Sequence, residues 1–323
     1  MEQIVRLVGI ARLAAEGNVL GAKRRIEYRT LPTRKWLNRC NSQRVPFHWS
    51  INPYRGCEYG CKYCYARFTH EFLERRDLDS FETEIYAKDW DTAAFRAELK
   101  CVRAGQILGI GTATDPYQPA ERKFGRTRQV LEALQDLAGS SIFITTKSNL
   151  VSRDIDLLQR LAEANEVGVT ITVTTTNARL ARLLEPYAPR PDLRIQAVKE
   201  LAQAGVQVGV IANPVLPLLT DSEENLESVA RAAKEAGAWQ FGANVVFLQP
   251  AAQRVFFPFL EEKFPEYLSR YEANFRQSAY LHGSYPERIR EMAHRIRERV
   301  GLCARDAEQI SPPPVPQGQM MLF

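Results

Sequence analysis

The sequence contains no uninterrupted apolar run of the roughly 20 residues that a bilayer-spanning helix needs. It also contains no long low-complexity tract, and its N-terminal stretch has acidic and polar breaks unlike those of a secretory signal. These absences predict a globular, cytoplasmic protein with no membrane association. With 323 residues, 45% of them hydrophobic, the chain can bury a large core as one barrel-sized domain or two smaller ones.

A strong excess of charge of one sign is also missing. The 43 Lys and Arg residues nearly balance the 38 Asp and Glu residues, and the net charge of +5 is a weak indication of an anionic partner. Cationic side chains are concentrated between Lys23 and Arg44, with Glu27 as the one acid and with Tyr28 and Trp36 interleaved. This mixture suits phosphate contacts and base stacking. A solvated segment that packs its aromatic rings on the domain explains it equally well.

Short β-rich runs alternate with helical patterns from residue 48 onward. The runs that predict strands are WSINPY (49–54), ILGIG (107–111), SIFITT (141–146), VGVTITVTT (167–175), VQVGVIA (206–212) and ANVVFL (243–248). The helical patterns lie near Tyr65–Glu74, Gly125–Leu137, Ile155–Ala164, Pro191–Ala204 and Ser222–Ala236. Six such units in series predict an α/β fold with a parallel sheet, closed into a partial (β/α)6 barrel of the TIM type. A further strand, ETEIYAK (82–88), is expected to flank the barrel.

Four segments are expected along the chain. They are a basic N-terminal extension or strap (1–45), the barrel (46–250), a C-terminal helical extension whose aromatic residues pack on the barrel (251–308), and a proline-rich spacer with a terminal peptide (309–323).

A polar residue follows the carboxyl end of each predicted strand. In chain order these residues are Cys57, Asp115, Lys147, Thr175 with Thr176, Asn213 and Gln249. Because the carboxyl ends of barrel strands meet on one face, where active sites are built, we expect these side chains to surround one site.

Three of the six cysteines, Cys57, Cys61 and Cys64, lie within the segment NPYRGCEYGCKYCYAR (52–67). A disulfide framework does not suit a reducing compartment, so the thiols indicate metal binding. Thiolates are soft ligands, which makes an iron-sulfur cluster and zinc the two candidates.

A structural zinc site normally has four protein ligands. The nearest possible fourth ligands are Cys40, His48 and His70, and none has the paired spacing of a zinc knuckle or ribbon. The spacing therefore favours an iron-sulfur cluster with three protein ligands and one open iron.

At these residues the sequence resembles the radical S-adenosylmethionine (SAM) superfamily. Its signature is a Cys-x3-Cys-x2-Cys loop after the first strand of a partial barrel, with an aromatic residue, here Tyr63, before the third cysteine. The resemblance implies a 4Fe-4S cluster on Cys57, Cys61 and Cys64, whose open iron binds the amino and carboxylate groups of SAM. It further implies reductive cleavage of SAM to a 5′-deoxyadenosyl radical, with an electron donor such as flavodoxin or ferredoxin.

Further motifs resemble the spore photoproduct lyase-like, DNA-repair branch of this superfamily: GTATDPYQPAE (111–121), TTKS (145–148), TVTTTN (172–177) and PRPDLR (189–194). By this resemblance, Lys147 pairs with the SAM carboxylate, Thr175 or Thr176 contacts the ribose or the carboxylate, and Arg194 assists. Thr112 and Asp115 are expected near the methionyl amine or the substrate. The adenine is expected against the backbone that ends at Asn213.

Each of these residues also has a structural explanation from the sequence. Lys147 could be a surface lysine of a βα turn, and Asp115 could cap the next segment, as the following proline suggests. Thr175 and Thr176 could be strand formers, and Arg194 could be a solvated helix residue.

The chain departs from the lyase at one position. In the lyase, a cysteine at the end of the second strand returns hydrogen to the product radical, whereas the segment Ile107–Tyr117 contains no cysteine. Cys101 lies upstream of the strand. Tyr117 is the candidate hydrogen donor in its place.

The last five residues, QMMLF, resemble the peptide by which bacterial DNA repair and replication proteins bind the sliding clamp. Gln319 would supply hydrogen bonds, and Leu322 and Phe323 would supply apolar anchors. A frayed apolar tail is the alternative.

Together, these motifs predict a radical SAM enzyme that acts on DNA at a lesion or a modified base, as a lyase or through other radical chemistry. The same cofactor chemistry applied to a peptide or a small metabolite is one alternative. The other is a nucleic-acid-binding module without turnover, stabilised by zinc or by a cluster.

Overall fold

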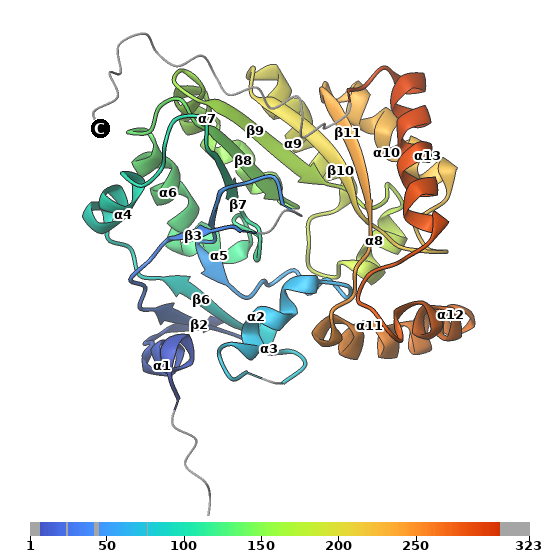
Figure 1. Cartoon of the computed structure of the whole chain (residues 1–323), viewed down its shortest axis with the longest axis horizontal. Helices are drawn as coiled ribbons and strands as arrows, with labels where there is room; N and C mark the ends of the chain where they lie inside the picture. The colour runs from blue at the N-terminus through green and yellow to red at the C-terminus, as the bar shows by residue number, and fades with distance from the viewer. Residues whose placement is uncertain (1–6, 24, 42–44, 76, 304–323) are drawn as a thin grey trace, which may run out of the picture.

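The computed structural model describes residues 7–23, 25–41, 45–75 and 77–303. In this part of the chain, a seven-stranded sheet has the order β11-β10-β9-β8-β7-β4-β3 (Figure 1). Its parallel strands are β4 (Trp49–Ile51), β7 (Ile107–Ile110), β8 (Ser141–Thr146), β9 (Glu166–Thr172), β10 (Gln207–Val215) and β11 (Gln240–Val245). The short strand β3 (Leu37–Arg39) pairs antiparallel with β4 at the edge. The predicted partial barrel is confirmed.

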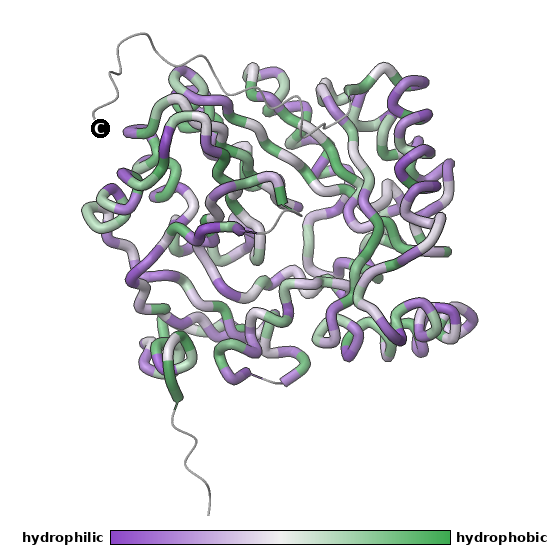
Figure 2. The backbone as a smooth tube through the Cα atoms, in the orientation of Figure 1, coloured by the Kyte–Doolittle hydropathy of each residue, from purple (hydrophilic) through white to green (hydrophobic). Residues whose placement is uncertain are grey.

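Helices cover the outer face of this sheet. They are α4 (Thr92–Leu99), α6 (Arg126–Leu134), the 3-10 segment η2 (Asn149–Asp154), α7 (Ile155–Ala162), α9 (Pro191–Gln203), α10 (Glu223–Glu235) and α13 (Ser284–Val300). Alternate strand residues such as Ile142, Ile144 and Val169 are buried in the same cluster as Leu134 and Leu158 of the helices. Figure 2 shows the solvent side of α13 largely in the hydrophilic colour, as expected for a helix with one buried face. No helix in the described ranges has the length and apolarity to cross a bilayer.

Two N-terminal strands and two later ones form a second, four-stranded sheet of order β1-β2-β6-β5. Its strands are β1 (Val19–Lys23), β2 (Ile26–Leu31), β6 (Glu84–Lys88) and β5 (Tyr54–Arg55), with α1 (Gly9–Glu16) and α3 (Ser80–Thr83) beside them. The extra strand predicted at 82–88 is thus a strand of this sheet. Tyr28 and Trp36 are both buried, so the packing explanation for them is correct and base stacking by these two rings is excluded.

Four more helices lie near the carboxyl ends of the barrel strands: α5 (Pro119–Phe124), α8 (Ala178–Leu184), α11 (Pro250–Lys263) and α12 (Pro265–Phe275). Phe256, Phe259 and Tyr271 of α11 and α12 are buried in one cluster with Cys57 and Cys61. The aromatic residues of this extension therefore pack against the cysteine loop, as the predicted structural role requires. The terminal peptide with Gln319, Leu322 and Phe323 lies outside the described residues, and clamp binding stays a prediction.

Several predicted elements differ from the structure. The strand expected at 49–54 ends at Ile51 as β4, and Tyr54–Arg55 pairs in the other sheet as β5. The helix expected at Tyr65–Glu74 is a 3-10 turn, η1 (Tyr65–Arg67), followed by one turn, α2 (Phe68–Glu71). Here the Thr69 hydroxyl donates to the carbonyl of Ala66 at 2.7 Å, a local bond of the kind that competes with regular helix.

The sixth strand was expected at 243–248 and is Gln240–Val245. It begins at Gln240, a buried polar residue whose side chain packs on Gly209. Because the prediction looked for apolar runs, it missed this polar start. Val246 and Leu248 leave the sheet and join the aromatic cluster. Asn213 is likewise inside β10, because this strand extends to Val215.

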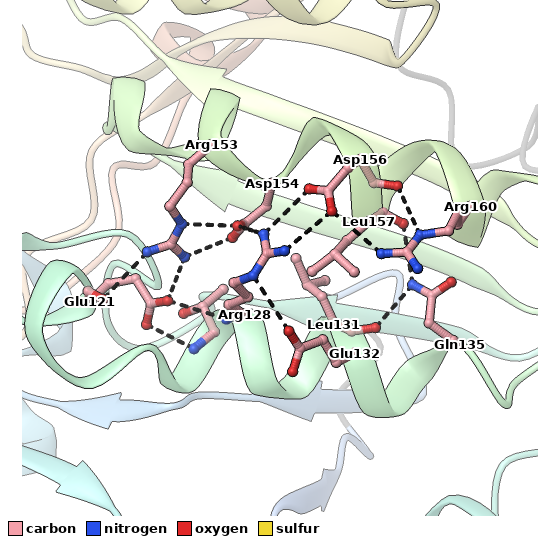
Figure 3. A network of polar contacts seen from close by, with 11 residues as sticks. Glu121, Arg128, Leu131, Glu132, Gln135, Arg153, Asp154, Asp156, Leu157 and Arg160 are labelled. Carbon is pink, nitrogen blue, oxygen red and sulfur yellow. Dashed lines mark hydrogen bonds and ion pairs between the residues drawn. The ribbon is translucent and has the colours of Figure 1, made fainter.

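Buried ion pairs connect α5, α6 and η2 on the helix side of the sheet (Figure 3). Arg153 Nη2 lies 2.7 Å from Glu121, and Arg128 Nη1 lies 2.7 Å from Asp154. Both carboxylates are completely buried. The Tyr54 hydroxyl donates to Glu121 at 2.6 Å, which connects this network to the segment just before the cysteine loop.

Glu121→Ala is expected to lower the free energy of unfolding by about 3 kcal/mol, because it removes the buried acceptor of the Tyr54 hydroxyl and one of the two buried carboxylates that Arg153 binds. The measurement is the midpoint of urea denaturation. Glu132→Ala is the matched control, because that carboxylate is half exposed and pairs with Arg128 at 3.4 Å. It should cost less than about 0.5 kcal/mol. Equal losses in the two variants would contradict the importance of the buried pair.

Candidate active site at the barrel mouth

The cysteine loop follows β5 and is held by backbone hydrogen bonds to both sides. Cys57 N donates to Phe81 O at 2.9 Å, and Lys62 N donates to Leu184 O at 2.9 Å. Gly56 enters the loop with φ +79°, and a Cβ atom there would lie 2.8 Å from the carbonyl oxygen of Glu84. Only glycine therefore permits this entry, which explains why the motif begins Gly-Cys.

Cys57 and Cys61 are buried in the site, and Cys64 is partly buried. Burial raises the pKa of Cys57 well above its ordinary value, and the charges of Asp115 and the other two cysteines raise it further. Burial likewise raises the pKa of Cys61 to about 12, and it raises that of Cys64. Without a bound cation, the thiols therefore stay protonated at neutral pH. Across the described residues, no three His, Cys, Asp or Glu side chains form a preformed single-ion site.

A buried ionic cluster lies against the loop. The hydroxyl of Tyr63, between Cys61 and Cys64, donates to Glu185, and Arg194 Nη2 lies 2.5 Å from the same carboxylate. Lys147 Nζ is 4.0 Å from Glu185 and 5.8 Å from the centre of the Tyr63 ring. Glu185 and Arg194 are almost completely buried, whereas Lys147 keeps 17% of its side chain exposed. The cluster thus brings together three predicted residues, Tyr63, Lys147 and Arg194.

Glu185 was missed by the sequence analysis. Burial alone would raise the pKa of Glu185, but the positive charges of Arg194 and Lys147 outweigh burial and lower it. Glu185 is therefore an anion that neutralises Arg194. The alternative explanation, a solvated Arg194, is wrong, because its guanidinium is buried and also donates to the carbonyls of Pro189 and Thr172. Its assistance in SAM binding stays a prediction. A buried arginine requires an anionic partner, but nothing in the sequence says which acid supplies it.

Asp115 connects the segment after β7 to the end of β8 by hydrogen bonds. Its carboxylate accepts from the Thr146 hydroxyl at 2.6 Å, from Lys147 N at 2.7 Å and from Tyr117 N at 2.9 Å. Burial raises its pKa, and these hydrogen bonds oppose the rise. The turn-capping explanation for Asp115 is confirmed, and contact with SAM or substrate stays a prediction.

The threonines also have protein partners. Thr112 Oγ1 accepts from Asn52 Nδ2 at 3.0 Å, and its carbonyl accepts from the Tyr65 hydroxyl. Thr175 Oγ1 accepts from Asn177 N at 3.0 Å, and Thr176 Oγ1 lies within hydrogen-bond distance of Ser228 Oγ. Their expected contacts with the cofactor stay predictions.

Asn213 and Tyr117 lie in different surroundings. Asn213 is half-buried near the carboxyl end of β10. The Tyr117 ring is buried in the core between sheet and helices, with Ile110 and Ile144, and lines a cleft on the outside of the strand ends. It does not line the Tyr63–Lys147–Glu185 cluster, and its role as hydrogen donor stays a prediction.

The side chains considered as a fourth metal ligand have other partners. His48 Nδ1 accepts from Ile107 N at 3.1 Å, and His70 Nε2 donates to the carbonyl of Glu84 at 3.0 Å. The Cys40 thiol donates to Asn38 O at 3.7 Å. Burial lowers the pKa of His70 to about 4, so His70 is neutral at physiological pH.

Comparisons with known proteins agree with this architecture. Residues 51–233 match the family model of the radical SAM superfamily. An uncharacterised protein of Mycobacterium tuberculosis is 33% identical over 252 residues, which is 78% of this chain and 74% of the relative. A radical SAM Nα-GlyT isomerase of Pseudomonas phage M6 is 28% identical over 166 residues, or 51% of this chain and 32% of the relative.

A solved spore photoproduct lyase mutant with bound S-adenosylmethionine and dinucleoside spore photoproduct superposes with a TM-score of 0.64 at 15% identity, covering 85% of this chain and 80% of the lyase. The fold and the site thus define an α/β-barrel enzyme of radical chemistry. The chain belongs to the radical SAM superfamily, with the fold of spore photoproduct lyase.

The unfolding free energy is expected to fall by about 3 kcal/mol as the pH is lowered from about 6.5 to about 4, through His70 alone. The unfolded histidine binds its proton near pH 6.5, whereas the folded one does so only near pH 4, so protonation in this window favours the unfolded chain. Urea denaturation at several pH values measures the slope. His70→Gln should flatten it and His294→Gln, an exposed control, should not. An unchanged slope in His70→Gln would contradict the assignment.

Tyr63→Phe is expected to cost about 2 kcal/mol of stability and Glu185→Gln about 3 kcal/mol, because each breaks the same buried ionic cluster. The double variant should lose at least about 1 kcal/mol less than the sum, since the two side chains share one hydrogen bond. Tyr54→Phe combined with Glu185→Gln is the control and should be additive within about 0.5 kcal/mol, because Tyr54 donates to Glu121 instead. If the stability losses of Tyr63→Phe and Glu185→Gln are additive in the double variant, the hydrogen bond between these two side chains does not contribute to stability.

Proposed function

We propose that Cys57, Cys61 and Cys64 hold a 4Fe-4S cluster and that the enzyme cleaves S-adenosylmethionine to act on DNA, at a lesion or a modified base. The observation that carries the proposal is the placement of three thiols, two buried and one partly buried, on one glycine-entered loop at the carboxyl ends of parallel strands, beside Lys147. This is the edge of a parallel α/β barrel where active sites are built.

The residues at the loop fit such a cluster. Thiolates are its usual ligands, and the site supplies three of them within eight residues, packed among Tyr63, Leu184 and Phe256. The apolar packing limits water around the sulfurs, and a bound cluster would stabilise the thiolates that burial alone disfavours. His48 and His70 are already engaged with the backbone, which supports three protein ligands and argues against a four-ligand zinc site.

Lys147 is the residue that we propose for the carboxylate of SAM. Its ammonium is partly exposed, and Glu185 and the Tyr63 ring hold it beside the loop. A lysine acts as a point charge towards a carboxylate, so the position suits an amino acid ligand. Once bound and reduced, the cluster supplies the electron that splits SAM into methionine and a 5′-deoxyadenosyl radical, and the protein's part is to hold and orient both.

The proposal of a DNA substrate is supported by similar proteins and by net charge. The lyase that shares this fold was solved with a dinucleoside photoproduct, and the phage relative is named as a GlyT isomerase. The net charge of +5 favours a polyanion. A peptide or small-metabolite substrate is the second candidate, and the salt dependence of DNA binding separates the two.

The holoenzyme, reconstituted under nitrogen, should contain about four iron and four sulfide per chain and form 5′-deoxyadenosine after reduction. Cys61→Ala should lose at least about 100-fold in this rate, because one corner of the cluster loses its ligand. Cys101→Ala, an exposed thiol outside the motif, is the matched control and should keep the rate.

The substrate arm uses the same assay with and without damaged duplex DNA. Stimulation by the DNA, and altered nucleosides in its digest, are the expected results. A protein that holds one zinc ion and leaves SAM intact would contradict the cofactor. Active cleavage of SAM that no DNA stimulates would contradict the substrate alone.

A further inference from the structure

A basic cleft of about 800 Å³ opens on the outer side of the barrel mouth, between β1, α5 and the segment from α8 to α9. Cations from each of these elements line it, and no Asp or Glu of the described chain does: Lys23, Arg122, Lys123, Arg182 and Arg190. Arg190 is paired with Asp192 at 2.6 Å. Arg122 is exposed at the end of α5, and Lys123 lies over the Tyr28 ring at 5.2 Å. The cleft therefore carries a positive potential towards solvent.

The inner wall of this cleft is the back of the cysteine loop. Tyr59, which lies between Cys57 and Cys61 in the chain, is a lining residue, and its hydroxyl donates to the carbonyl of Tyr117 at 3.1 Å. Tyr187 N donates to the carbonyl of Tyr59 at 3.2 Å. Tyr59 thus places the cleft beside the loop that carries Cys57 and Cys61.

Ser148 and Asn149, which follow Lys147 in the chain, line the cleft at the end of β8. No residue that we assign to SAM lines it: Tyr63, Thr112, Asp115, Lys147, Thr175, Thr176, Arg194 and Asn213 all lie elsewhere. A molecule bound in the cleft would therefore leave these side chains available to the cofactor.

The rings in the cleft do not suit a single-stranded nucleic acid. Tyr28, Tyr59 and Tyr117 are buried, and the first two have their hydroxyls engaged with Glu58 and with the protein backbone. Tyr187 alone among them offers an open ring face, with 65% of the residue exposed. Single-strand binding typically stacks successive bases on several open rings, and one ring does not provide that.

We propose that this basic cleft is the docking site of an acidic redox protein, of the flavodoxin or ferredoxin kind, that reduces the cluster. The proposal rests on the proposed function, because it needs a cluster on the loop. One electron leaves the reduced partner, which is oxidised by one electron, and enters the cluster; no bond is formed or broken at this step. Complementary charge with a small contact area is typical of short-lived redox encounters.

The test compares two reductants on the reconstituted holoenzyme, a reduced acidic flavodoxin and photoreduced deazaflavin, with 5′-deoxyadenosine formation as one readout. The second readout is the affinity of oxidised flavodoxin for the chain without its cluster, measured by titration calorimetry, which each cleft variant should weaken and the control should not. Arg122→Glu and Lys23→Glu each reverse one cleft charge on a different element. Arg295→Glu, exposed on α13, reverses one charge away from the cleft and is the matched control. All three change the net charge equally.

Each cleft variant should lower the flavodoxin-driven rate about threefold to tenfold at low ionic strength, and salt should erase the difference. The control variant and every deazaflavin-driven rate should stay unchanged. Flavodoxin-driven rates that the cleft variants leave intact would overturn the docking site, as would equal losses with both reductants. Loss of oligonucleotide binding with flavodoxin-driven rates retained would assign the cleft to nucleic acid instead. A wild-type enzyme that fails to cleave SAM with deazaflavin would overturn the proposed function and this proposal with it.

Discussion

The cysteine loop depends on a buried carboxylate that it does not contain. Between β5 and η1, the chain crosses the barrel mouth without a regular hydrogen-bonded structure, so partners from the barrel must fix its shape. Glu185 does this by accepting from Tyr63 inside the motif while it neutralises Arg194. Arg194 in turn binds the carbonyls of Thr172 and Pro189, which ties the loop to β9 and to the start of α9. Burying either ion alone would be strongly unfavourable, so the arrangement forms as a unit.

A second buried carboxylate, which also binds one tyrosine and one arginine, lies at the entrance to the loop. Glu121 accepts from the hydroxyl of Tyr54 and pairs with Arg153, just as Glu185 accepts from Tyr63 and pairs with Arg194. Tyrosines before and within the motif are thus each fixed by a buried carboxylate with an arginine partner. Because charge-assisted hydrogen bonds are strong and directional, two of them fix the position of the loop more narrowly than apolar contacts could.

The order of the strands and the residues at their ends could be predicted from the sequence, because β-branched runs and helical periodicity are local signals. Element ends were less accurate: Gln240 starts a strand with a polar residue, and Thr69 interrupts a helical pattern with a local hydrogen bond. The pairing of Tyr63 with Glu185 could not be predicted, because 122 residues separate them and the fold alone brings them together. The motif PRPDLR pointed to Arg194 as a site residue. Its burial depends on Glu185, which the sequence analysis did not identify.

Burial of the loop both favours and disfavours binding of a cluster. It excludes water, which a low-potential cluster requires, but it also raises the pKa of all three thiols and so disfavours the thiolates that bind iron. Asp115 adds to this effect at Cys57, whereas the charge of Lys147 lowers the pKa of Cys61 and Cys64. The positive charge of the metal is therefore needed to complete the site, since the protein supplies position and the cluster supplies the charge that stabilises its own ligands. The hydrogen bonds from Tyr63 to Glu185 and from Tyr54 to Glu121 involve no thiol, so these contacts shape the loop independently of the sulfurs.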